Sequence, residues 1–334
     1  MASTNLSNII EPMVFSAYVN QASVVNNAFI QSGVLVRSNE FDVRAGQAGA
    51  VGEMPHFNPF PWAESNIMSD DPSALSTPAN LTTGAQIFRK EYREKDWGAM
   101  DLTSRISGED IGAQIATYVA KYWQTEVQNH VLKRLVSIAA DNADMVNTIG
   151  TDSATNATNP EASTKASLGA ILDTVQTMGD ARDSLSAIVM HSQVYTNLMK
   201  LDQTSFAVPS AVQNFVTFNG KRVILDDNVT VTQGTNRKMY STYVVGPAFA
   251  YGESSIPNAT EVWRNPAAGN GGGEERLYSR KQFLVHPVGF SLNTSVTPAS
   301  GQKSLSLTQY ATSGTYNRVF DRKNVPIAIL RSNG

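Results

Sequence analysis

Residues 107–140 read SGEDIGAQIATYVAKYWQTEVQNHVLKRLVSIAA, and this stretch determines the fold. Apolar side chains recur in it at helical spacing, and neither glycine nor proline interrupts residues 113–140. The recurring residues are Ile111, Ile115, Tyr118, Val119, Tyr122, Val127, Val131, Leu135 and Ile138. Ser107 and Asp110 have the spacing of a capping box. We expect one helix from about residue 108 to 140, roughly 50 Å long at ~1.5 Å per residue, with its ends at opposite edges of a domain.

Residues 41–98, before this helix, have no helical periodicity and are too many for an ordinary connection. A strand-like start at Phe41 and Val43 leads to glycines, a stretch rich in proline and aromatic residues, and an acidic turn. Alternation then resumes over residues 81–88. A long extended hairpin that packs on another subunit would explain these aromatic residues, and a β-subdomain with its own core is the alternative.

Residues 1–40 are apolar and rich in amide side chains, with Glu11, Arg37 and Glu40 as their charged residues. Their apolar side chains need something to cover them. Two interpretations remain open. The segment is either an arm that lies across a neighbouring subunit or an amphipathic helix on its own domain.

Residues 150–253 alternate between helical and strand patterns, which indicates a compact α/β unit. Asn219-Gly220 between two apolar runs favours a hairpin with a type I′ turn. Ser192 is expected to cap a short helix. The expected helices cover 168–178 and 192–201, and the expected strands cover 187–190, 215–218, 222–225 and 240–245. From Glu261 onward the pattern is mainly β, with strands expected at 261–264, 277–292 and 325–330.

Composition excludes several classes of function. The chain has 334 residues, enough for one large or two ordinary domains, and only 16% are charged, against roughly 25% in an average soluble domain. A low-charge surface suits a protein that packs against copies of itself. The net charge of −3 argues against a sequence-specific DNA reader, and the absence of cysteine excludes disulfides, thiolate catalysis and cysteine-based zinc sites. No run approaches the ~20 apolar residues that span a bilayer.

The chain also lacks a recognisable catalytic or metal-binding pattern. The histidines, at 56, 130, 191 and 286, include no pair at the spacing of a helical metal site. His191 and His286 are interpreted as capping or packing residues. The paired carboxylates Asp70–Asp71 and Asp226–Asp227 lack calcium-loop spacing and are interpreted as exposed turns. We therefore expect no catalytic residue, no metal and no cofactor.

The order of these elements resembles that of tailed-bacteriophage major capsid proteins of the Hong Kong 97 type. Three phrases also look like that family: residues 188–192 (IVMHS) leading into Tyr195 and Leu198, residues 219–227 (NGKRVILDD) and residues 283–290 (FLVHPVGF). The resemblance implies an α+β fold. Its parts would be an N-terminal arm (1–40), an extended hairpin called the E-loop (41–98), a peripheral domain with a long spine helix (99–149), an α/β axial domain (150–253) and a return to the peripheral domain (254–334).

The resemblance further implies a structural subunit of an icosahedral capsid that assembles into hexamers and pentamers around double-stranded DNA, without reading its sequence. The expected partners are copies of the chain, a portal, a decoration protein and a separate scaffolding protein, the last because no scaffold-like N-terminal domain is present. No membrane is involved, and assembly in the cytoplasm of a bacterial host would lead to a location in the virion. Covalent cross-linking in this family needs an E-loop lysine, but the first lysine is Lys90, so we expect none.

Within the E-loop, Phe57, Phe60 and Trp62 are the expected anchors on a neighbouring subunit, since aromatic residues dominate contact energies. Arg89, Arg93 and Glu94 are the expected charged contacts at its base. Two alternatives stay open: the shell of an encapsulin-like compartment, and an α/β enzyme with an unrecognised site.

Overall fold

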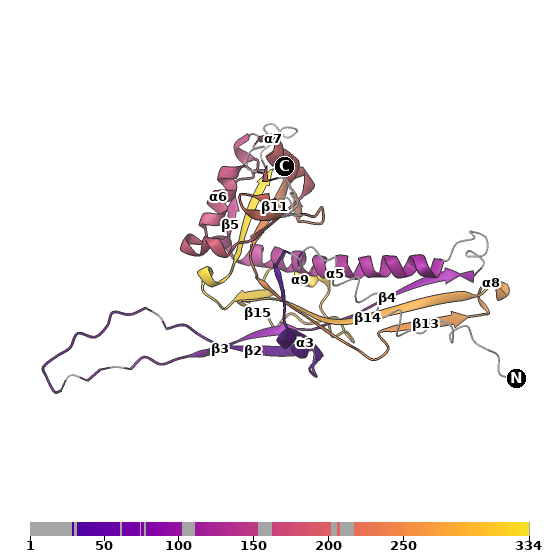
Figure 1. Cartoon of the computed structure of the whole chain (residues 1–334), viewed down its shortest axis with the longest axis horizontal. Coiled ribbons are helices and arrows are strands. Elements are labelled where there is room, and N and C mark those ends of the chain that lie inside the picture. The colour runs from indigo at the N-terminus through magenta and orange to yellow at the C-terminus, as the bar shows by residue number, and fades with distance from the viewer. Residues whose placement is uncertain are drawn as a thin grey trace.

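The computed structural model of the chain describes residue 29 and residues 32–60, 62–73, 75–76, 78–101, 111–152, 162–201, 206–207 and 217–333. Figure 1 shows three parts: a layer of long strands along one long helix, an upright domain above that helix, and a narrow ribbon that extends away to the left. The chain leaves the lower layer for the upright domain after the long helix and later returns to it.

The long helix α5 covers Ile111–Asp141, which confirms the helix expected from the apolar periodicity. The capping box at 107–110 lies outside the described residues. Val119, Trp123, Val127 and Val131 are buried along α5, because both sheets of the molecule pack against it. With 31 residues, the helix is roughly 46 Å long.

The lower sheet is built around one long strand, β14. On one side β14 pairs with β4 along its first ten residues, and on the other side with β13 and then β12. The face with Trp97, Leu277 and Phe283 packs on α5, and the indole N–H of Trp123 donates to Ser279 Oγ at 2.9 Å. The strands are β1 (Leu35–Arg37), β12 (Phe249–Ser254), β14 (Glu274–Pro287), β13 (Thr260–Asn265) and β4 (Glu91–Met100).

The upright domain contains the larger sheet, whose central strands are buried on both faces. Ile188, Met190 and Val244 face the helices α6 (Leu168–Gln176) and α7 (Ser192–Leu201), whereas Val189 and Tyr243 face the core shared with α5. Its strands in spatial order are β5 (Val146–Thr148), β17 (Ile327–Asn333), β11 (Lys238–Val245), β6 (Ala187–Met190), β9 (Lys221–Leu225), β8 (Thr217–Phe218) and β7 (Phe206–Ala207), with β10 (Val231–Gln233) paired to β11.

Several local predictions for this domain are confirmed. The expected hairpin is present, with Asn219 and Gly220 both left-handed at φ 49° and 72°, as a type I′ turn requires. The helix at 192–201 is also present, but its cap differs from the prediction. The N–H of Gln193 donates to His191 Nδ1 at 3.0 Å, and the N–H of Ser192 donates to Asp227 at 3.0 Å. His191 is therefore a capping residue, and Ser192 begins the helix.

Three expectations were wrong. Residues 39–46 form the helix α3 (Asn39–Gly46) and not a strand, because Ser38 caps it and Glu40 pairs with Arg44 one turn later. The strand expected over 277–292 stops at Pro287, since Gly289 reverses the chain at φ 89° before β15 (Phe290–Leu292) pairs with β16 (Tyr316–Arg318). The final strand, β17, lies between β5 and β11 in the upper sheet, not in the peripheral return assigned to 254–334.

The ribbon consists of β2 (Val51–Phe57) and β3 (Thr83–Arg89), joined by residues 58–82. It is shorter than the 41–98 expected, because α3 precedes it and residues 91–100 belong to the lower sheet; E-loop below means residues 51–89. Short elements complete the fold: α8 (Ala268–Gly271), α9 (Leu307–Tyr310), and 3-10 turns at Ala143–Met145, Ala162–Thr164, Gly179–Ser184 and Arg322–Asn324. Over the described ranges, no helix is long and apolar enough to cross a membrane.

Close backbone packing at Gly252 fixes α3 on the lower sheet. A Cβ at position 252 would overlap the carbonyl group of Phe41 in α3. We predict that Gly252→Ala lowers the free energy of unfolding by about 1–3 kcal/mol, the usual cost of overpacking. Urea denaturation would measure it. The matched control is Gly169→Ala in α6, where the nearest atom is 3.9 Å away, and it should gain up to about 1 kcal/mol of helix propensity. Equal effects of the two substitutions would contradict the packing argument.

His286 on β14 is 1% exposed and lies against the rings of Phe88 and Tyr316. Burial, assisted by the positive charge of Arg134, lowers the pKa of His286 from 6.5 to about 3. Because the folded pKa lies below the unfolded value, the unfolded chain binds the extra proton between these values. Stability from this residue is complete above pH 6.5 and is lost as the pH falls towards 3.

We predict that protonation linked to His286 lowers the free energy of unfolding by about 2 kcal/mol between pH 7 and pH 5, at 1.36 kcal/mol per unit of pKa shift. His286→Leu should reduce the pH dependence by that amount in urea titrations at the two pH values. An unchanged difference between pH 7 and pH 5 in the variant would mean that His286 is not buried in its neutral form.

Candidate assembly interface

The base of the E-loop is fixed to the lower layer by polar contacts on one face. The N–H of Ile87 donates to Ser291 Oγ at 3.0 Å, and the side chain of Gln86 accepts from the N–H of Gly289 at 2.9 Å. Further along, the ring of His56 packs edge-on against Phe320 at 4.8 Å. Because period-2 alternation turns every second side chain away from this support, the other face of the ribbon is open.

The strands of the ribbon end at Asn58, which closes the ladder. Its N–H donates to the carbonyl of Thr82 at 2.9 Å, and its side chain donates to Thr82 Oγ1 at 3.1 Å. Beyond this point the described residues of 59–81 form no strand or helix. Figure 1 shows this segment reaching well away from the rest of the molecule.

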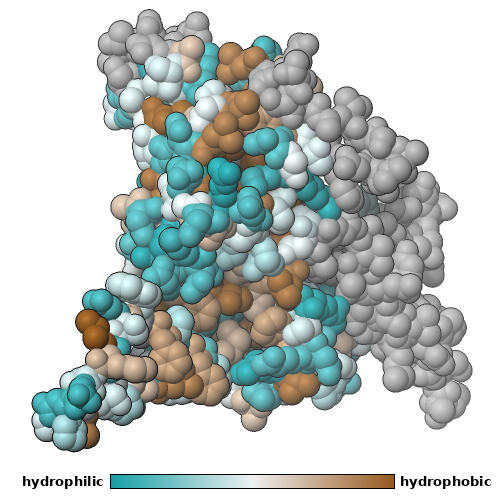
Figure 2. Space-filling view, turned by 60° about the vertical axis from the view of Figure 1, so that its left-hand side comes forward, coloured by the Kyte–Doolittle hydropathy of each residue, from teal (hydrophilic) through white to brown (hydrophobic). Residues whose placement is uncertain are grey.

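Large apolar side chains are exposed along the E-loop. The three expected anchors, Phe57, Phe60 and Trp62, are 70%, 58% and 91% exposed. Five others were missed by sequence reasoning: Val51, Ile67, Met68, Leu75 and Leu81. They occur at irregular spacing among polar residues, so no periodic pattern marks them. Figure 2 turns the E-loop side of the molecule towards the viewer and shows hydrophobic patches between hydrophilic ones on this face.

Apart from Arg89 at its base, the charged residues of the E-loop are all acidic. No lysine or arginine occurs between Arg44 and Arg89, whereas Glu53, Glu64, Asp70 and Asp71 lie in this interval. Asp71 accepts hydrogen bonds from the hydroxyl and the N–H of Ser73 at 2.6 and 2.8 Å, which lowers its pKa. The Asp70–Asp71 pair therefore belongs to a turn, as expected. In the described part of the chain, no three acidic or histidine side chains are grouped so as to hold a metal ion.

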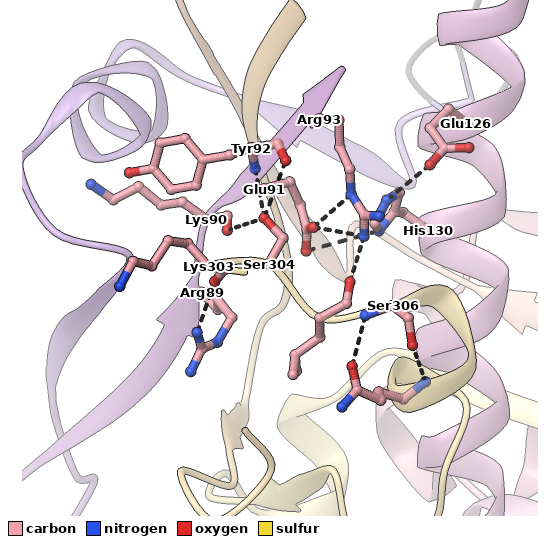
Figure 3. A network of polar contacts seen from close by, with 12 residues as sticks. Arg89, Lys90, Glu91, Tyr92, Arg93, Glu126, His130, Lys303, Ser304 and Ser306 are labelled. Carbon is pink, nitrogen blue, oxygen red and sulfur yellow. Dashed lines mark hydrogen bonds and ion pairs between the residues drawn. The ribbon is translucent and has the colours of Figure 1, made fainter. Parts of the chain in front are cut away.

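At the base of the E-loop, residues 303–305 cross over the chain between β3 and β4, and we call them the strap. Arg89 donates to the carbonyl of Lys303 at 2.8 Å, and Arg93 donates to the carbonyl of Leu305 at 2.5 Å. Between them, Ser304 Oγ accepts from the N–H of Tyr92 at 2.7 Å (Figure 3). Arg89 and Arg93 are thus bonded within the chain, while the side chain of Glu94 is exposed on β4.

A buried ion pair joins this base to the long helix. The carboxylate of Glu91, which is fully buried, accepts from Arg134 Nη2 at 2.9 Å and from Arg93 at 3.0 Å. Arg134 is also fully buried. Its Nε donates to the hydroxyl of Tyr316 at 3.0 Å, and its guanidinium lies 3.9 Å from the ring centre of Tyr310. From the sequence, the charged residues of this stretch were expected to contact a neighbouring subunit, because nothing in the sequence marks Glu91 as buried.

His130 completes the cluster in its neutral form. Arg134 Nη1 donates to His130 Nδ1 at 2.8 Å, so the ring proton is on Nε2. This nitrogen faces Glu126 at 3.5 Å (Figure 3). Burial, with the positive charges of Arg134 and Arg93, lowers the pKa of His130 well below 6.5. Burial also raises the pKa of Glu126. The cluster therefore has a structural arrangement: Glu91, His130 and Arg134 are fully buried and pair with one another.

Residues 96–248 match the model of a protein family described as Gp13-like, major capsid protein 13-like. The whole chain is 29% identical over 332 residues to the major capsid protein of Bacillus phage SPP1, covering 98% of this chain and 97% of the relative. The matched segment begins in β4 and runs through α5 to the sheet of the upright domain.

Solved capsid structures have the same fold at low sequence identity. The capsid of Ralstonia phage GP4 aligns with a TM-score of 0.60 at 9% identity, covering 93% of this chain and 92% of that one. The capsid of cyanophage Pam1 aligns with a TM-score of 0.57 at 8% identity, covering 93% of each chain. These similarities establish the fold across almost the full length.

The sequence relative and the fold agree with the long helix, the projecting E-loop and the absence of a catalytic arrangement among the described residues. They support neither an encapsulin-like compartment nor an enzyme. The chain is a major capsid protein of a tailed bacteriophage, a structural shell subunit with the Hong Kong 97-type fold.

Proposed function

We propose that this capsid subunit assembles into hexamers and pentamers in which the E-loop of each copy lies on the next copy. The observation that carries this proposal is the exposure of the E-loop anchors, above all Trp62 at 91%. Several large apolar side chains that are exposed together in one projecting segment are typical of an interaction site. In a shell, the most abundant partner is a second copy of the same chain.

The shape of the subunit supports a head-to-tail contact. The E-loop lies at one end of the long axis, and the connection through α8 that joins β13 to β14 lies at the other (Figure 1). A contact between two different surfaces closes into a ring when the rotation between copies allows it. The extended E-loop adds buried area that the compact domains alone could not supply.

Phe57, Phe60 and Trp62 are the proposed anchors of this contact. Glu94 is the proposed charged contact at the base, since its side chain is exposed. Arg89 and Arg93 would contribute to this contact through the guanidinium N–H groups that are not bonded to the strap. The contact is non-covalent in this proposal, because no lysine precedes Lys90, and Lys90 itself is 1% exposed and bonded to the carbonyl of Gln47.

The remaining parts of the proposal concern the other components of the particle. Assembly would take place in the cytoplasm of a bacterial host with a separate scaffolding protein and a portal, and a decoration protein could bind the finished shell. The shell would enclose double-stranded DNA. With a net charge of −3, the subunit would hold this DNA by packing and backbone contacts without reading its sequence.

We predict that Trp62→Ser abolishes or strongly reduces shell formation while the subunit remains folded. Central aromatic anchors are worth ≥2 kcal/mol each, so the concentration needed for assembly should rise about 30-fold. Co-expression with the scaffolding gene, followed by sedimentation and negative-stain electron microscopy, measures assembly; circular dichroism checks the fold.

The matched control is Trp62→Phe, which keeps an aromatic anchor and should assemble at a concentration near that of the wild type. If Trp62→Ser and the triple replacement of Phe57, Phe60 and Trp62 by serine both form normal shells, the E-loop does not hold the capsid together.

A second prediction concerns covalent bonds. Assembled and aged shells, dissolved in hot denaturant, should give a single band at the subunit mass of 36.1 kDa on a denaturing gel. A ladder of higher masses would demonstrate cross-linking between subunits and contradict the non-covalent proposal.

A further inference from the structure

The direction of the E-loop depends on the corner of the chain at residues 89–91, where β3 ends and β4 begins. Arg89 is the last residue of β3 and Glu91 is the first residue of β4, so only Lys90 separates the E-loop from the lower sheet. The N–H of Lys90 donates to the carbonyl of Ala50 at 2.9 Å, and its ammonium group donates to the carbonyl of Gln47. Both strands of the ribbon are therefore tied to each other at this corner.

Two separate parts of the chain hold the corner from outside. The strap contacts Arg89, which precedes Lys90, and Tyr92 and Arg93, which follow it. Ser304 Oγ also lies 3.4 Å from the carbonyl oxygen of Lys90. The helix α5 reaches the same corner through Arg134. We call Glu91, Arg134 and the strap the E-loop clamp.

The hydrogen bonds of the clamp restrict the orientation of the E-loop relative to α5. Each nitrogen of the Arg134 guanidinium donates to a partner: Nε to Tyr316, Nη1 to His130 and Nη2 to Glu91. Rotation of the corner by more than a small angle would leave Glu91 and Arg134 as buried, unpaired charges, which is strongly unfavourable. An apolar contact at the same place would tolerate sliding, because dispersion and hydrophobic contacts have no preferred direction.

We propose that the E-loop clamp fixes the direction in which the E-loop leaves the subunit, with Glu91 and Arg134 as positioning residues for the contact with the neighbouring copy. The consequence for assembly rests on the proposed function of the E-loop. The direction itself does not, because it is a property of the single subunit.

The absence of cysteine from the chain makes a direct test possible. Spin labels at Ala85→Cys on β3 and Lys121→Cys on α5, both exposed, report the distance between ribbon and helix in dilute, unassembled full-length subunits. We expect a narrow distribution for the otherwise wild-type chain and a broad or shifted one for Glu91→Gln, which keeps the shape but removes the charge. Glu126→Gln is the matched control, because Glu126 belongs to the same cluster but has no contact with the E-loop. It should leave the distribution narrow.

Ser304→Ala provides a second, milder variant if Glu91→Gln fails to fold. It removes the hydroxyl that joins the strap to Tyr92 without leaving a buried charge, and it should broaden the distribution in the same way. If both variants give the narrow distribution of the wild type, the clamp does not set the direction.

Assembly of the unlabelled variants separates this inference from the proposed function. With the scaffolding gene present, Glu91→Gln should yield about tenfold fewer closed shells, the shift that one lost charged hydrogen bond produces in a two-state equilibrium. Broad distances with an undiminished yield of shells would support the clamp and contradict the role of the E-loop in assembly. Narrow distances would contradict the clamp whatever the yield.

Discussion

The pairing of Glu91 with Arg134 is the interaction on which the extended part of the subunit depends. Removing two ions from water costs several kcal/mol for each, and their mutual attraction returns this only with good geometry and full hydrogen bonding. Arg134 meets that condition through Tyr316, His130 and Glu91. A lysine would not match this arrangement, because its three donors share one freely rotating nitrogen, whereas the guanidinium holds donors on three nitrogens in one plane. The pair therefore fixes the relative orientation of β4 and α5 more than it raises the free energy of unfolding.

The helix α5 connects the Glu91–Arg134 pair to both sheets of the subunit. One stretch of α5 packs on the lower sheet through Trp123, and Val131 and neighbouring residues lie in the core shared with the upper sheet. Gln128 donates to the buried carboxylate of Asp226 at 2.5 Å, which connects the helix to the end of β9. Both sheets and the E-loop are thus mounted on one rigid element. Buried residues of both sheets share one hydrophobic core with α5.

The sequence predicted the parts of the fold that rest on local patterns. The helix α5, the strand β6 and the Asn219-Gly220 hairpin were all predictable, because apolar period and turn chemistry are encoded in adjacent residues. The position of β17 was not, since a buried strand reads the same in either sheet. The helix α3 was missed because Phe41 and Val43 alternate over too few residues to distinguish strand from helix.

The same distinction applies to the candidate interface. The exposure of the proposed anchors was predictable, since Phe57, Phe60 and Trp62 are large apolar residues in a stretch without core periodicity. The clamp was not, because residues 90–96 are an alternating run of charges that is typical of a solvated surface. Its burial depends on Arg134 and Ser304, which lie far away in the chain and carry no mark of their roles. Long-range partners of this kind decide whether a charge is exposed or buried, and local sequence does not contain them.

An exposed apolar ribbon on every subunit creates a risk of disordered association, and the composition of the E-loop addresses it. Prolines at positions 55, 59, 61, 72 and 78 remove backbone donors and prevent continuous pairing of one E-loop with another. Its four acidic residues, with no basic residue among them, make two E-loops repel each other. These features leave the side chains free to fill pockets while blocking the strand pairing that leads to aggregates. An E-loop whose charge and prolines disfavour pairing with its own kind, but which carries Trp62 at its surface, is suited to the proposed contact with a different surface on the next copy.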